Sequence, residues 1–124
     1  MATVLLVDDD PVILRLLEVN FRLDGFETRS AARGEEALEQ AAEEAPDAVV
    51  LDVMMPGMDG YEVCRRLREL PGLAQVPVVF LTARAEDADR GPVGVEGEFQ
   101  HVTKPFDPST LVEAVRARIA GRSS

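Results

Sequence analysis

Side chains that could do chemistry lie directly after short apolar runs of this sequence. They are Asp8, Asp9 and Asp10 after the run Val4 to Val7, Asp52 after Ala48 to Leu51, Thr82 after Val76 to Leu81, and Lys104 after Phe99 to Thr103. If these runs are parallel strands, their carboxyl ends meet at one edge of a sheet, where open α/β sheets bind ligands. Carboxylates, a hydroxyl and an ammonium group would then converge on one site.

Each of these residues, taken alone, has an ordinary structural explanation. Asp10 precedes Pro11 and is most simply a helix N-cap, so we assign it no chemistry. A cap, a turn or a solvated surface charge would account for any one of Asp8, Asp9, Asp52, Thr82 and Lys104. Together these explanations fail, because clustered carboxylates repel one another and raise one another's pKa unless a cation lies among them.

A hard divalent cation would remove this repulsion. Mg²⁺ takes carboxylate and carbonyl oxygens as ligands, retains some waters, and shares its coordination shell with phosphoryl groups. Lys104 would add a second, monovalent countercharge. The cluster therefore predicts a magnesium site at which a phosphoryl group is held or transferred.

The apolar pattern indicates the strands that must position these residues. The runs Val4 to Val7, Ala48 to Leu51 and Val76 to Leu81 are continuous, as in strands covered on both faces of a parallel sheet. The segments Phe26 to Ser30 and Phe99 to Thr103 alternate apolar and polar residues. We therefore expect these two segments at the edges of the sheet.

Helical patterns occupy the segments between the strands. We expect helices from Pro11 to near Gly25, from Gly34 to Ala45, from Gly60 to Leu70 and from Pro108 to about Ile119. A further helix should lie between about Ala85 and Gly97, shortened or displaced because Gly91, Pro92 and Gly94 oppose helix formation. Five strands alternating with about five helices predict an α/β fold, with a doubly wound parallel sheet and helices on both faces.

Composition and charge exclude several classes of protein. The 124 residues are 46% hydrophobic and 29% charged, which fits one domain over residues 1–124. The 23 acidic and 13 basic residues give a net charge of −10, which disfavours binding to nucleic acid or to an anionic membrane. Cys64 is the single cysteine, and no apolar stretch approaches the roughly 20 residues of a membrane span. We expect a cytoplasmic protein without a secretory signal.

Four segments carry a resemblance to a known family. VLLVDDD, VVLDVMMPGMDG, VVFLTAR and VTKPF resemble, in order and spacing, the motifs of the receiver domain of bacterial two-component response regulators, of the stand-alone, chemotaxis-regulator type. The resemblance extends from Val4 to about Ile119. It implies the flavodoxin-like strand order 2-1-3-4-5 and a cis peptide bond between Lys104 and Pro105.

The resemblance also implies roles for the acidic residues. Asp52 matches the phosphoacceptor, a carboxylate nucleophile that forms an aspartyl phosphate and also contacts the metal. Asp8 and Asp9 match the acidic pair that binds Mg²⁺, Asp9 directly and Asp8 through water. The backbone carbonyl of Met54 matches the remaining protein ligand of the metal.

Three further residues match the part of the family's site that responds to the phosphoryl group. Thr82 matches the hydroxyl that hydrogen-bonds the phosphoryl oxygen, and Lys104 matches the lysine that pairs with it. His101 stands where the family usually has tyrosine or phenylalanine, a ring that swings inward when the Thr82-type hydroxyl moves. The resemblance therefore implies Thr82 and His101 as switch residues, although a histidine on an edge strand could instead simply face solvent.

The function implied by the resemblance is a phosphorylation-activated signalling switch that catalyses its own phosphorylation and hydrolysis, rather than an enzyme with a separate substrate. The expected donor is a sensor histidine kinase or a histidine phosphotransfer protein. The expected output is a protein partner that binds the face formed by the fourth helix, fifth strand and fifth helix. We expect a monomer before phosphorylation.

Two other functions stay open. An aspartate-nucleophile phosphohydrolase would want a second acid two residues after its nucleophile, where Met54 stands here. An interaction module with vestigial phosphorylation would show loss of the acceptor, an acid or the lysine, and none is lost.

Overall fold

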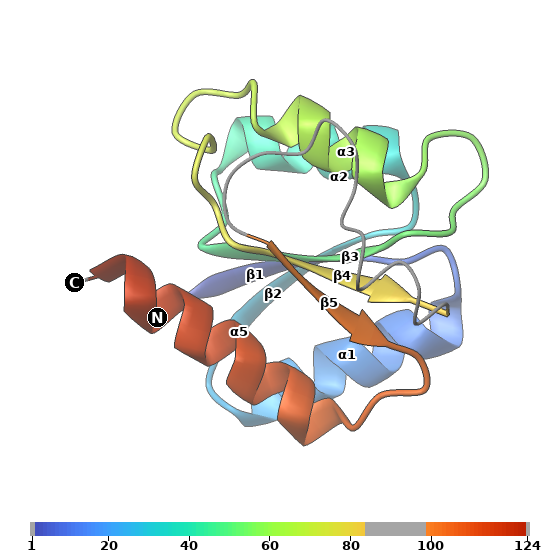
Figure 1. Ribbon diagram of the computed structural model, residues 1–124, viewed down its shortest axis with the longest axis vertical. Helices are drawn as coiled ribbons and strands as arrows, with labels where there is room; N and C mark the ends of the chain where they lie inside the picture. The colour runs from blue at the N-terminus through green and yellow to red at the C-terminus, as the bar shows by residue number, and fades with distance from the viewer. Residues whose placement is uncertain (1, 84–98, 124) are drawn as a thin grey trace.

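Five parallel strands form one sheet, and the prediction of a doubly wound α/β fold with strand order 2-1-3-4-5 is confirmed. The structure is a computed structural model that describes residues 2–83 and 99–123. Its sheet order is β2-β1-β3-β4-β5 (Figure 1). The strands are β1 (Thr3–Val7), β2 (Glu27–Ala31), β3 (Ala48–Asp52), β4 (Val78–Thr82) and β5 (Phe99–Thr103). The helices of the described segments are α1 (Pro11–Leu23), α2 (Gly34–Glu43), α3 (Gly60–Leu67) and α5 (Pro108–Ser123). The helix expected between Ala85 and Gly97 lies outside the described residues.

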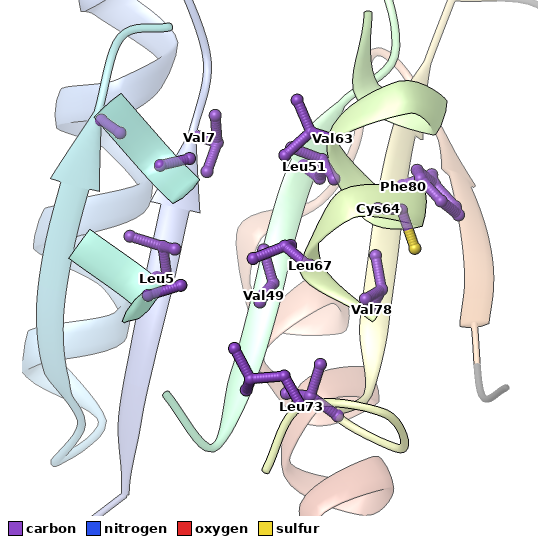
Figure 2. Close-up of a cluster of buried hydrophobic side chains, with 14 of the residues drawn as sticks. Leu5, Val7, Val49, Leu51, Val63, Cys64, Leu67, Leu73, Val78 and Phe80 are labelled. Carbon is purple, nitrogen blue, oxygen red and sulfur yellow. The ribbon is translucent and has the colours of Figure 1, made fainter. Parts of the chain in front are cut away.

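The core has two layers, one on each face of the sheet. On one face, side chains such as Leu5, Val49 and Phe80 pack against α2 and α3 (Figure 2). On the other face, the alternate side chains of the same strands, such as Leu6 and Val50, pack against α1 and α5. Because helices cover both faces, β1, β3 and β4 are buried almost throughout, as their continuous apolar runs predicted.

The strands at the two edges are less buried than the central three. β2 and β5 are largely half-exposed, which agrees with their alternating sequences. β4 begins at Val78, two residues later than expected. The cause is Pro77, which has no N–H to donate, together with the N–H of Val76, which bonds back into the preceding turn.

α1 and α3 begin at aspartate caps, of which Asp10 was predicted from the sequence. Asp10 accepts a hydrogen bond from the N–H of Val12, and Asp59 from that of Glu62, both at 2.9 Å. α3 ends at Leu67, earlier than expected, because the N–H groups of Glu69 and Leu70 bond three residues back in tighter turns. In the part of the chain that is described, no helix is both long and apolar enough to cross a membrane.

The start of α3 touches the backbone at the end of β3. Gly60 donates its N–H to the carbonyl of Val53 at 3.0 Å. A Cβ atom at Gly60 would collide with the carbonyl oxygen of Asp52 and lie 2.9 Å from the Cα of Val53. Only a residue without a side chain lets α3 approach this closely, so Gly60 helps to fix the backbone of Asp52.

Replacing Gly60 with alanine should lower the free energy of unfolding by about 1–3 kcal/mol, because a backbone carbonyl cannot turn aside as a side chain can. Urea denaturation measures this change. Gly121→Ala is the matched control, since nothing lies within 4 Å of a Cβ there and alanine favours a helix. Equal stability of Gly60→Ala and the wild type would contradict the close contact.

Candidate functional site

The residues predicted to carry chemistry do meet at the carboxyl edge of the sheet. Asp8 follows β1 and Asp52 ends β3, and these two strands are neighbours. The chain leaves them in opposite directions, to β2 on one side and β4 on the other, which makes this the switch point where ligands bind in open α/β sheets. Thr82 ends β4, and its carbonyl accepts a hydrogen bond from the N–H of Lys104 at 2.7 Å.

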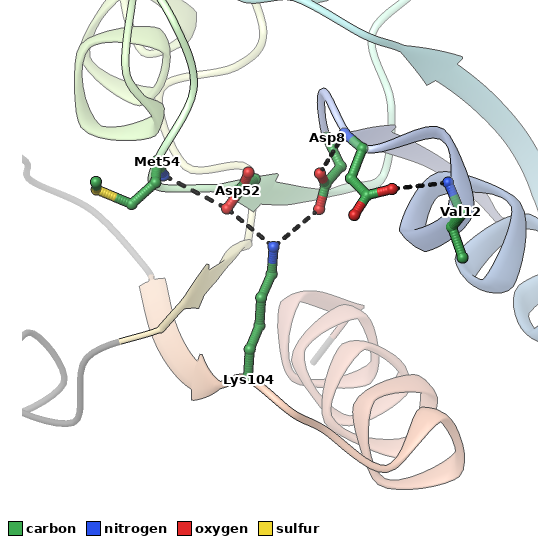
Figure 3. Close-up of polar contacts among 6 residues, drawn as sticks. Asp8, Val12, Asp52, Met54 and Lys104 are labelled. Atoms are coloured by element: carbon green, nitrogen blue, oxygen red, sulfur yellow. Dashed lines mark hydrogen bonds and ion pairs between the residues drawn. The ribbon is translucent and has the colours of Figure 1, made fainter.

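Lys104 bridges the two buried carboxylates of the site. Its Nζ lies 3.3 Å from Oδ2 of Asp8 and 3.3 Å from Oδ1 of Asp52 (Figure 3). Asp8 also accepts the N–H of Asp10 at 2.9 Å, and Asp52 accepts the N–H of Met54 at 3.4 Å. The peptide bond between Lys104 and Pro105 is cis, as the resemblance implied. These contacts hold both carboxylates toward the same point.

Three carboxylates form a group that fits a divalent cation. One oxygen each of Asp8, Asp9 and Asp52 lies within 4.8 Å of the other two. Asp8 and Asp52 are only 1% and 4% exposed, whereas Asp9 is exposed to solvent. Three negative charges against the single ammonium of Lys104 leave an excess of two. Hard oxygen donors, an open side toward water and this charge balance all suit Mg²⁺.

The protonation of the site reflects its burial. Burial of Asp52, together with the nearby charge of Asp8, raises its pKa from 3.8 to about 6, although Lys104 opposes the shift. Burial alone would lower the pKa of Lys104, but the two carboxylates outweigh it and raise that pKa. Asp52 is therefore ionised at neutral pH at a cost in stability, and a cation beside it would favour the ionised form.

Two residues lie in surroundings that the sequence did not determine. Methionine is usually a packing residue, but Met54 is 63% exposed beside Asp52. The role of its carbonyl as a metal ligand stays a prediction. The sequence left open whether His101 turns inward or faces solvent; in the structure its ring is partly buried and stacks on Phe80 with centroids 5.2 Å apart, on the α3 side of the sheet.

Sequence reasoning missed Tyr61 in α3. Its hydroxyl lies 3.0 Å from Nε2 of His101, so the two side chains form a hydrogen bond between helix and strand. The two residues are 40 positions apart, and no local motif pairs them. A parallel sheet that places α3 over β4 and β5 could have suggested the contact, but only after the register was known.

The architecture and the site together define an α/β domain with an acidic, lysine-bridged cluster at its switch point. The sequence matches the family model of the response regulator receiver domain over residues 4–116. The chain therefore belongs to the receiver domains of response regulators.

Similar proteins agree with this membership. The DNA-binding response regulator MtrA of Mycolicibacterium smegmatis is 44% identical over 117 residues, which cover 94% of this chain and 50% of MtrA. The solved structure of the chemotaxis protein CheY4 of Vibrio cholerae has a TM-score of 0.86 and 32% identity, with 94% of this chain and 98% of that chain covered. The chain thus spans about half the length of curated relatives such as MtrA, and nearly all of CheY4.

A third relative was solved with a metal. The receiver domain of the sensor histidine kinase PA1611 of Pseudomonas aeruginosa has a magnesium ion coordinated in its active site cleft. It has a TM-score of 0.85 and 29% identity, and the match covers 96% of this chain and 98% of that one.

The raised pKa of Asp52 predicts a pH-dependent effect of removing its charge. Because the folded pKa lies above the unfolded value, the folded state binds the proton more tightly, and Asp52 costs stability as the pH rises from about 4 through 6. In metal-free buffer, the free energy of unfolding of Asp52→Asn should therefore exceed that of the wild type by an amount that grows with pH. The increase in this difference from pH 4.5 to pH 7.5 should be about 1–2 kcal/mol.

Urea denaturation of both proteins at the two pH values measures this gain. Asp10→Asn serves as the control, because asparagine also caps helices well and the stability of this variant should stay close to that of the wild type. A stability difference between Asp52→Asn and wild type that stays the same at both pH values would contradict the raised pKa.

Proposed function

We propose that this chain is a phosphorylation-activated switch that accepts a phosphoryl group on Asp52. The observation that carries the proposal is the bridge from Lys104 to Asp8 and Asp52, with Asp9 beside it, at the switch point of the sheet. A carboxylate nucleophile, hard donors for a cation and a fixed ammonium are the parts that phosphoryl transfer requires.

The residues divide the work of the transfer among them. An oxygen of Asp52 attacks the phosphorus of a phosphohistidine, the O–P bond forms, and the N–P bond breaks with its electron pair going to the imidazole nitrogen. Asp8 and Asp9, with Asp52 and the carbonyl of Met54, would hold Mg²⁺, which neutralises charge on the phosphoryl oxygens when bound.

Lys104 and Thr82 complete the proposed site. Lys104, now bound to Asp8 and Asp52, would turn to the phosphoryl oxygens once Asp52 carries the phosphoryl group as an acyl phosphate. Thr82, which is 1% exposed, would donate its hydroxyl to the same group from the end of β4. The phosphohydrolase alternative has no comparable support, because the side chain of Met54 offers no acid beside the nucleophile.

An exposed apolar stripe on α1 suggests where the phosphodonor binds. Val12, Leu16, Val19 and Leu23 are 73%, 39%, 38% and 82% exposed, and their spacing of four, three and four residues places them on one face of the helix. Such a stripe fits an apolar helix of another protein.

The stripe leads directly to the site. An apolar hollow beside α1 is lined by Ile13, Leu16, Pro105 and Phe106, and by Lys104, which also binds Asp52. Arg15 and Arg22 follow one side of the stripe, so two copies of α1 packed antiparallel would bring like charges together. A helical kinase or phosphotransfer protein with acidic residues beside its apolar stripe is the proposed occupant.

The phosphoacceptor is tested by intact mass. With Mg²⁺ and a small acyl phosphate, the wild type should gain one phosphoryl group, and Asp52→Asn should gain none because its amide is not a nucleophile. Lys104→Ala should bind Mg²⁺ but accumulate less phosphoprotein. Asp10→Asn keeps the helix cap and should be labelled like the wild type. Full labelling of Asp52→Asn would refute the assignment.

The α1 stripe is tested by comparing two donors. Leu16→Glu places a charge in the stripe, so the rate of transfer from the cognate phosphohistidine protein should fall at least tenfold, while labelling by a small acyl phosphate should stay unchanged. Arg33→Ala changes the net charge equally at the exposed residue before α2 and should affect neither rate. Unchanged transfer to Leu16→Glu from the protein donor would exclude this surface.

A further inference from the structure

Four rings join α3 to β4 and β5 on the face of the sheet opposite α1 and α5. Tyr61 of α3 lies edge-on to Phe80 of β4, with centroids 4.9 Å apart. The His101 ring of β5 stacks on Phe80 at an interplanar angle of 29°, and Phe99 lies edge-on to it at 5.9 Å. Figure 2 shows Phe80 beneath α3 in this layer. We call these four residues the aromatic cluster.

A hydrogen bond fixes His101 within the aromatic cluster. The Tyr61 hydroxyl lies 3.0 Å from Nε2 of the imidazole, and both side chains are partly buried. A bond between half-buried groups beside apolar rings is stronger than the same bond in water, and an imidazole nitrogen that loses its partner there favours turning to solvent. Loss of this bond would therefore favour a second position of the His101 ring, outside the cluster.

Both ends of this hydrogen bond connect to the phosphoacceptor site. Tyr61 follows Gly60, the residue that packs against the backbone of Asp52. His101 pairs with Phe80, two residues before Thr82, and lies three residues before Lys104. The hydrogen bond thus completes a continuous path of contacts. The path runs from Asp52 through the start of α3 to β5, and returns through Lys104 to Asp52.

We propose that Tyr61 is a positioning residue whose hydrogen bond to His101 couples the aromatic cluster to occupancy of Asp52. It does so by holding the end of β5, and with it Lys104, in place for a phosphoryl group. The inference rests on the proposed function, because it assumes that Asp52 receives that group. The arrangement of His101 differs from that of a freely turning ring on an edge strand, because α3 holds the imidazole before any phosphoryl group is present.

Thermodynamic linkage makes the coupling measurable from either end. If the bonded state of His101 favours a phosphoryl group at Asp52, then that group must favour the bonded state by the same factor. Removing one hydrogen bond of this kind should change the affinity of the site by about two- to tenfold. We expect the affinity to fall, because Lys104 is less well placed without the hydrogen bond.

The test uses Tyr61→Phe, which removes the hydroxyl and keeps the ring on Phe80. The affinity for beryllofluoride with Mg²⁺, a mimic of the phosphoryl group, is measured by calorimetry. The chain has one histidine and one tyrosine, so the imidazole NMR signals belong to His101 without ambiguity. In Tyr61→Phe we expect these signals to move in the free protein and the affinity to fall two- to tenfold.

Two further variants make the test specific. Ser30→Ala removes another hydroxyl that joins a strand to a helix, bonded to Glu18 at 2.6 Å on the opposite edge of the sheet, and should leave the affinity unchanged. His101→Phe should weaken binding as Tyr61→Phe does, and the double variant should be no weaker than either.

Each outcome decides the proposal. Unchanged beryllofluoride affinity in Tyr61→Phe, or additive losses in the double variant, would overturn the coupling even if the imidazole signals move. If the wild type itself does not bind beryllofluoride, the proposed function fails, and the coupling that rests on it falls as well. Unmoved imidazole signals in free Tyr61→Phe would show separately that the hydroxyl does not hold the ring.

Discussion

Repulsion between carboxylates is the constraint on which the rest of this structure depends. Asp8 and Asp52 are almost fully buried next to one another, and the pKa of Asp52 is raised to about 6 as a result. Lys104 compensates for part of this by bonding to both. A single ammonium cannot balance three carboxylates, so the folded protein holds an arrangement that a divalent cation and a phosphoryl group would complete.

A stiff scaffold is needed to keep such a site together. β1, β3 and β4 form this scaffold, because their apolar side chains are buried on both faces of the sheet. Their close packing resists displacement of the strands when the carboxylates repel one another. The hydrophobic layers also offset the cost of burying charge at the strand ends. Stability and the candidate site are therefore separated along the strands: the interior residues stabilise the sheet, and the residues at or just after the strand ends form the site.

The sequence predicted the architecture and the acidic cluster well for a physical reason. Continuous apolar runs and helix caps are local signals, and parallel strands bring the residues that follow them to one edge whatever the details of packing. Asp8, Asp52 and Lys104 could thus be placed together from their positions in the chain.

Features that depend on the register of the strands and the packing of the helices could not be predicted from the sequence. The bond between Tyr61 and His101 arises from how α3 lies over β4 and β5, and neither residue shows a periodic signal for it. The exposure of Met54 is similar, since only the path of the loop after β3 decides whether that side chain packs or faces solvent. The start of β4 and the end of α3 differ by a few residues from the prediction, because a proline or a tight turn redirected an N–H there.

The two faces of the sheet present different surfaces around one site. α1 carries the exposed apolar stripe, and the hollow at its end contains Lys104. The opposite face carries the aromatic cluster, in which α3 holds β5 through Tyr61 and His101. Lys104 follows β5 and connects the two surfaces, because it lines the hollow and its ammonium binds Asp52. A group that enters on the α1 side and changes the partners of Lys104 therefore acts on the same strand that the aromatic cluster holds from the other side. The hollow on the α1 side and the aromatic cluster on the other side are thus two separate surfaces, joined by one lysine and the strand that precedes it.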